Sequence, residues 1–136
     1  MKTAVFANSK GGVGKSTIAL LTSLSLATKY NRANVELIDL DPQATTSDSL
    51  SRFANYRFKV INNEEFYLGS TTPNNSRIIS HLESSSDNHI SECYSVIDCP
   101  AGNDPVRSTF LLHSDIIFIP TSVSDADVFA TKKYIA

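Results

Sequence analysis

The chain has 136 residues, of which 41% are hydrophobic and 19% are charged. This length is typical of one domain, and the composition supplies a hydrophobic core and excludes an intrinsically disordered chain. Lys and Arg number 12 against 14 Asp and Glu, for a net charge of −2. That balance excludes a histone-like polycation, so any contact with nucleic acid would need a local basic patch.

The cysteines, the histidines and the chain start exclude other classes of protein. Cys93 and Cys99 cannot form a disulfide scaffold or a four-thiolate metal site, and their spacing is not that of a redox pair. His81, His89 and His113 have no carboxylate or cysteine companions at ligand spacing, so they predict no metal site of their own. No apolar run reaches about 18 residues and no signal-peptide pattern precedes the first predicted strand, so we expect a cytoplasmic protein without a membrane span.

The first predicted elements are a strand, a loop and a helix. A short apolar run at residues 3–7 predicts a buried strand, which ends at a glycine-rich loop. A stretch without Gly or Pro, from Lys15 to about Tyr30, predicts a helix. Its expected buried face consists of Ile18, Leu21, Leu24 and Ala27, widened by Leu20 and Leu26.

The remaining elements alternate between strands and helices. Apolar runs predict strands at residues 35–40, 65–69, 94–98 and 115–120. Helices are predicted at residues 47–56, 75–83 and after Asp127, with a surface loop at residues 84–88. Because nearly continuous apolar strands are interleaved with helical segments, we expect an α/β fold with a mostly parallel sheet and helices on both faces.

The glycine-rich loop carries the strongest functional signal. Three of the five glycines lie between the first strand and the helix, at positions 11, 12 and 14. Backbone N–H groups in such a loop form a nest for anionic oxygens, to which the helix N-terminus adds its dipole. Lys15 then supplies an ammonium for the outer phosphates and Ser16 a hydroxyl for Mg²⁺. The loop therefore predicts a nucleotide-binding site, and the alternative is an ordinary glycine-rich turn.

In the general phosphate-binding pattern G-x-x-x-x-G-K-[ST], the first glycine would fall at position 9. This chain has Ser9 there, followed by Lys10. The segment from Lys10 to Thr17, KGGVGKST, resembles the deviant Walker A motif of the ParA/MinD family of ATPases. The resemblance implies a P-loop NTPase domain over residues 1–136, with Lys10 and Lys15 as catalytic residues. Lys10 would reach the partner's nucleotide in an ATP-sandwiched dimer; alternatively it is a solvated loop lysine. The residues implied to bind the phosphates of ATP are Gly11, Gly12, Val13, Gly14, Lys15, Ser16 and Thr17.

Carboxylates lie at the ends of two of the predicted strands. Asp39 and Asp41 share one side of an extended segment, at the end of the sheet where α/β folds place ligands. The segment from Asp39 to Gln43 resembles the family's second nucleotide motif, which implies that Asp41 orients or deprotonates the attacking water. Asp39 and Ser16 would support the coordination shell of Mg²⁺. Asp98 would hold the ion as the Walker B aspartate. The alternative is that these aspartates begin or cap turns.

The resemblance implies a function in partitioning plasmids or chromosomes. ATP would drive homodimerisation, the dimer would contact DNA without sequence preference, and a DNA-binding adaptor protein would stimulate slow hydrolysis. The Asp-Pro-Gln sequence at residues 41–43 favours this ParA-type function. Two alternatives remain: a positioning ATPase with MinD-like membrane cycling, and a non-hydrolysing remnant that acts through protein contacts. Members of the family usually extend further, so we expect additional strands and the base-binding residues to be missing from this sequence.

Overall fold

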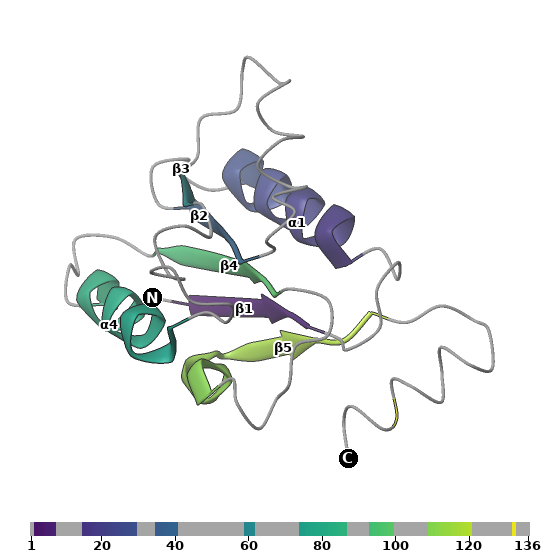
Figure 1. Ribbon diagram of the computed structural model, residues 1–136. Coiled ribbons are helices and arrows are strands. Elements are labelled where there is room, and N and C mark those ends of the chain that lie inside the picture. Colours follow the sequence, from purple (N-terminus) through teal and green to yellow (C-terminus); the bar gives the residue numbers. More distant parts are fainter. Residues whose placement is uncertain are drawn as a thin grey trace.

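The computed structural model describes residues 2–7, 15–29, 35–40, 59–61, 74–86, 93–99, 109–120 and 132 (Figure 1). Within these residues, five strands form one sheet with the spatial order β3-β2-β4-β1-β5. They are β1 (Lys2–Phe6), β2 (Val35–Asp39), β3 (Lys59–Ile61), β4 (Tyr94–Asp98) and β5 (Ile116–Phe118). All four pairings are parallel. The carboxyl ends of the five strands therefore lie at the same end of the sheet.

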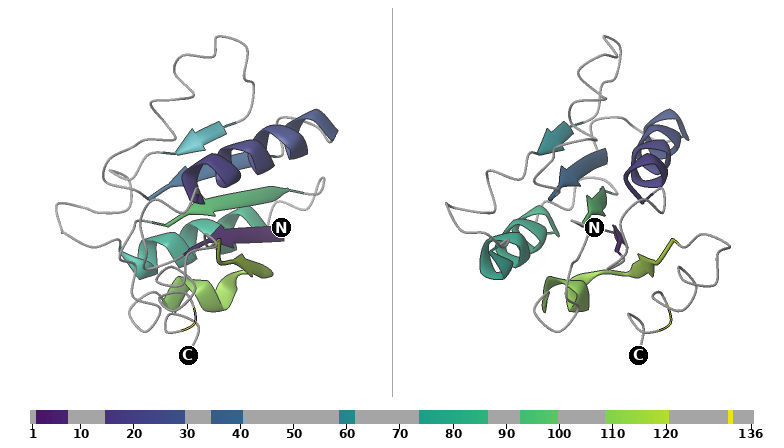
Figure 2. Two further views of the ribbon diagram at one scale, coloured as in Figure 1. Left: turned by 90° about the vertical axis from the view of Figure 1, so that its right-hand side faces the viewer. Right: turned by 45° about the vertical axis from the view of Figure 1, so that its right-hand side comes forward.

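A helix covers each face of the sheet, as the sequence predicts. The helix α1 (Lys15–Lys29) lies on one face and α4 (Asn75–Ser86) on the other (Figure 2). Side chains alternate between the faces along each strand: in β2, Leu37 belongs to the core cluster under α1 and Ile38 to the cluster under α4. Burial on both faces explains the nearly continuous apolar strands. No helix in the described part of the chain has the length and apolarity needed to cross a bilayer.

The buried face of α1 differs from the predicted one. Four side chains spaced four residues apart are buried against the sheet: Lys15, Ala19, Ser23 and Ala27. Ile18 and Leu21 are 41% and 58% exposed, so the prediction that they are buried is wrong. Small side chains let the helix axis approach the strands closely, and the large ones lie to the sides. Leu20, Leu24 and Leu26 are partly buried there, as predicted.

The line of buried side chains on α1, from Lys15 to Ala27, is called the buried stripe below. It contains one hydroxyl, which is hydrogen-bonded within the helix. Ser23 is fully buried, and its Oγ donates to the carbonyl oxygen of Ala19 at 3.0 Å. A buried hydroxyl without a partner would be costly. With this bond, a serine is tolerated where a larger apolar side chain would hold the helix away from the sheet.

The other elements match the sequence predictions unevenly. The predicted helix at residues 75–83 continues to Ser86, so the loop expected from residue 84 was placed too early. The last predicted strand, residues 115–120, is shorter, and β3 and the 3₁₀ helix η2 (Thr109–His113) were not predicted. The predicted helix at residues 47–56 and strand at residues 65–69 lie outside the described residues. After Asp127 only Lys132 is described, and it is helical.

The corrected face of α1 can be tested by two substitutions. Ala19→Leu should lower the free energy of unfolding by about 1–3 kcal/mol, because there is no room for three more carbons between helix and sheet. Leu21→Ala, which removes a larger side chain from the exposed side, should change it by less than about 0.5 kcal/mol. Urea denaturation measures both. A greater loss for Leu21→Ala than for Ala19→Leu would contradict this packing.

Candidate functional site

Lys15 is the first residue of α1, and its side chain is only 6% exposed. It lies one turn before Ala19 on the buried stripe, so its stem is directed along the face of the helix that meets the sheet. Its Nζ donates to Asp98 Oδ1 at 3.0 Å and to the main-chain carbonyl of Cys99. The ammonium therefore joins the start of α1 to the end of β4.

Two aspartates lie next to each other at the carboxyl end of the sheet. Asp39 and Asp98 are the last residues of β2 and β4, both are fully buried, and the strand register pairs them directly. Neighbouring strands are about 4.8 Å apart. Two residues earlier, Leu37 and Val96 pack in the cluster under α1. Because side chains alternate, both aspartates face the same side as α1, where Lys15 begins the helix.

The donor set at this point suits a small hard cation. Mg²⁺ in proteins usually binds one or two carboxylates and takes its remaining ligands from water and substrate phosphates. Asp39 and Asp98 supply two buried carboxylates, and the hydroxyl of the half-buried Ser16 follows Lys15. Within the described ranges, no group of three or more His, Cys, Asp or Glu side chains forms a metal-binding cage. The residues present therefore fit Mg²⁺ bound together with a phosphate, and they do not form an all-protein site.

The structure describes only some of the predicted site residues. It brings together Lys15, Asp39 and Asp98, and it places Ser16 and the exposed Thr17 in the first turn of α1. The other predicted site residues lie outside the described residues: Lys10, Gly11, Gly12, Val13, Gly14 and Asp41. Their roles remain predictions, although Gly14 directly precedes Lys15 and Asp41 follows Asp39 by two positions.

Cys99 contributes its main chain to the site, not its thiol. The side chain is fully buried, and this burial raises the pKa of the Cys99 thiol well above its ordinary range; Lys15 opposes the shift and Asp98 adds to it. A thiol held in its neutral form is a poor nucleophile. Cys99 therefore takes part through its carbonyl oxygen, which accepts a hydrogen bond from Lys15.

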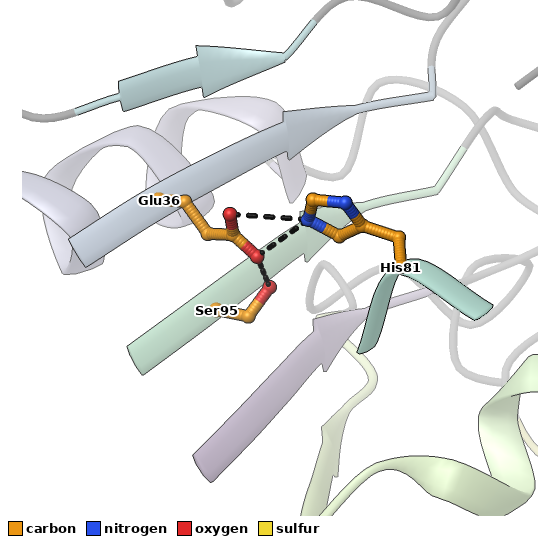
Figure 3. A network of polar contacts seen from close by, with 3 residues as sticks. All are labelled: Glu36, His81 and Ser95. Atoms are coloured by element: carbon orange, nitrogen blue, oxygen red, sulfur yellow. Dashed lines mark hydrogen bonds and ion pairs between the residues drawn. The ribbon is translucent and has the colours of Figure 1, made fainter. Parts of the chain in front are cut away.

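A second polar network, which the sequence did not predict, joins α4 to two strands (Figure 3). The Nε2 of His81 lies 3.0 and 3.1 Å from the two carboxylate oxygens of Glu36 in β2. Ser95 in β4 donates from its hydroxyl to Glu36 Oε1 at 2.9 Å. The sequence has no carboxylate at ligand spacing from His81, and the fold supplies one from a distant strand. Glu36 lies 45 residues away in sequence, so ligand spacing could not reveal it.

The order of groups in this network does not suit nucleophilic catalysis. In a catalytic triad the histidine contacts the serine and removes its proton. Here both Ser95 and His81 contact Glu36, which lies between them (Figure 3). Glu36 also precedes Asp39 by three residues, away from the carboxyl end of the sheet. We therefore interpret the network as an anchor that holds α4 on the sheet.

Comparison with known proteins decides the family. A family model for an AAA domain matches residues 1–95. Maintenance of carboxysome distribution protein A of Halothiobacillus neapolitanus is 31% identical over an alignment of 137 positions. The match covers 98% of this chain and 56% of that protein. A virulence plasmid ParA family protein of Chlamydia psittaci is 46% identical over 50 residues, 37% of this chain and 19% of that protein. This chain belongs to the ParA/MinD family of ATPases.

The fold agrees with that assignment. A putative plasmid partition protein from Borrelia burgdorferi, solved bound to AMPPNP, superposes with a TM-score of 0.66. It is 21% identical, and the match covers 98% of this chain and 68% of that one. The predicted P-loop α/β fold is therefore confirmed. This ParA/MinD-family chain spans only 56% of the length of its carboxysome-distribution relative.

The anchor on α4 can be tested by Glu36→Ala. The substitution removes the acceptor of a buried hydroxyl and the partner of His81, so the free energy of unfolding should fall by about 1–3 kcal/mol. Glu83→Ala is the matched control, since Glu83 is an exposed acidic residue on α4 and should leave stability nearly unchanged. Equal losses in the two variants, measured by urea denaturation, would show that the network does not stabilise the fold.

Proposed function

We propose that this chain is the nucleotide-binding part of an ATP-driven dimerisation switch that partitions plasmid or chromosomal DNA. The observation that carries the proposal is the buried contact of Lys15 with Asp98, beside Asp39, at the carboxyl end of the parallel sheet. Ligands bind at this end in open α/β sheets. The partition protein of Borrelia burgdorferi, with its bound AMPPNP, supports ATP as the nucleotide.

In this proposal the start of α1 holds the triphosphate. The backbone N–H groups of residues 11–16 and the ammonium of Lys15 would stabilise the charge on the phosphates, which is the main source of rate enhancement in phosphoryl transfer. Ser16, Asp39 and Asp98 would hold Mg²⁺, which when bound neutralises part of the phosphate charge. Asp41 would orient or deprotonate the attacking water. Lys10 would contact the nucleotide of the partner subunit, so that catalysis depends on dimerisation.

The partners in this proposal are those that the resemblance to the ParA/MinD family implies. ATP binding would produce a homodimer, the dimer would contact DNA without sequence preference, and an adaptor protein would stimulate hydrolysis in the cytoplasm. The Chlamydia psittaci relative is a ParA family protein of a virulence plasmid, which supports a plasmid as cargo. Because this chain spans 56% of its longer relative, contacts with DNA and adaptor would also draw on segments that correspond to the rest of that protein.

A second candidate is the positioning of a protein cargo. The observation that favours it is the match to the carboxysome distribution protein along 98% of this chain. The same ATP-dependent dimer would serve both functions, and only the partner would differ. This candidate would be supported if the protein distributed carboxysome-like assemblies and did not stabilise a plasmid.

The switch predicts opposite behaviour for two variants. Asp41→Ala should reduce ATP hydrolysis by about 100-fold, because the water loses its general base, and should accumulate an ATP-bound dimer. Lys10→Ala should bind ATP as a monomer and fail to dimerise. Hydrolysis assays, a fluorescent ATP analogue and light scattering after size exclusion measure the three properties. Lys29→Ala, at the far end of α1, is the control and should behave like the wild type.

Each component of the proposal has an outcome that contradicts it. Undiminished hydrolysis in Asp41→Ala would remove Asp41 from its role. Dimerisation of Lys10→Ala with ATP would remove Lys10 from the interface. A wild-type chain that binds ATP and dimerises without ever hydrolysing it would identify the non-hydrolysing remnant.

A further inference from the structure

The ammonium of Lys15 has two partners on β4. A lysine ammonium carries three N–H donors, and here Asp98 Oδ1 and the carbonyl of Cys99 accept two of them. Lys15 is 6% exposed and Asp98 is fully buried, so water competes little for this contact. An ammonium held in this way can direct at most one N–H toward a phosphate.

Moving Lys15 fully onto a phosphate would break its buried ion pair with Asp98. Breaking a buried ion pair by removing one partner is strongly unfavourable, because the remaining buried charge loses the attraction that offset its desolvation. A divalent cation at Asp98 would replace the ammonium as the counter-charge. Release of Lys15 and arrival of the cation are therefore coupled, and the coupling acts equally in both directions.

We propose that Asp98 is a positioning residue that competes with phosphate for Lys15 and so makes tight nucleotide binding depend on a divalent cation. The inference rests on the proposed nucleotide site and adds a second role for Asp98 beside that of a cation ligand. The two roles differ in the absence of cations. In EDTA, a residue that only binds the cation changes nucleotide affinity through the repulsion between its charge and the phosphates, whereas a residue that also holds back Lys15 lowers the affinity further.

The test measures the affinity of a fluorescent ATP analogue in EDTA for three proteins. In Asp98→Asn the side chain keeps its shape and loses its charge, so it holds Lys15 less strongly and the analogue should bind about tenfold more tightly than to the wild type. Asp39→Asn removes a carboxylate from the paired position on β2 and reports the general effect of one charge fewer at this edge. The gain in affinity for the analogue should clearly be greater in Asp98→Asn than in Asp39→Asn.

A measurement on the wild-type protein is independent of how the variants fold. In ¹⁵N-lysine spectra, the buried Lys15 ammonium should give a resonance protected from exchange with water. That resonance should change little when the analogue is added in EDTA, and shift when Mg²⁺ follows. A full shift with the analogue alone would overturn the proposal.

The outcomes separate this inference from the proposed function. If Asp98→Asn binds the analogue in EDTA no more tightly than Asp39→Asn, the competition for Lys15 is refuted and the nucleotide site stands. If the wild-type protein binds no analogue with or without Mg²⁺, the proposed function and this inference fail together.

Discussion

The buried ion pair between Lys15 and Asp98 is the contact on which the site depends. Charged groups are rarely buried without compensation, and removing one partner of such a pair typically costs about 3–5 kcal/mol. This chain places an ammonium and two aspartates at one end of its sheet, all nearly or fully inaccessible to water. The arrangement is a poor means of stabilising a fold when apolar side chains would serve. In the proposed function, this arrangement would bind a ligand that itself carries both phosphate and a cation.

Two regular periodicities produce this geometry. Side chains four residues apart on α1 align Lys15 with Ala19 and with the rest of the stripe that meets the sheet. Alternation along parallel strands in register places Asp39 and Asp98 on that same side. Neither periodicity depends on the loop between β1 and α1. The core that fixes the sheet and helix therefore also fixes the relative positions of the three charged groups.

The sequence allowed most of the fold to be predicted, because long apolar strands and a helix without Gly or Pro have clear periodicities. It missed β3, a strand of only three residues, and η2, which is too short to show a repeat. It also assigned Ile18 and Leu21 to the core of α1, since hydrophobicity alone does not show that small residues permit closer packing. The motifs predicted Lys15, Asp39 and Asp98 as site residues, and the fold brings these three together. Glu36 and His81 are joined only by the tertiary fold.

The most direct test of the site is a crystal structure of the protein with AMPPNP and Mg²⁺. We expect the terminal phosphates at the N-terminus of α1, within hydrogen-bond distance of Lys15 Nζ, and the cation beside Asp39 and Asp98. A nucleotide bound at another part of the chain, with Lys15 and Asp98 still paired and distant from its phosphates, would contradict this expectation.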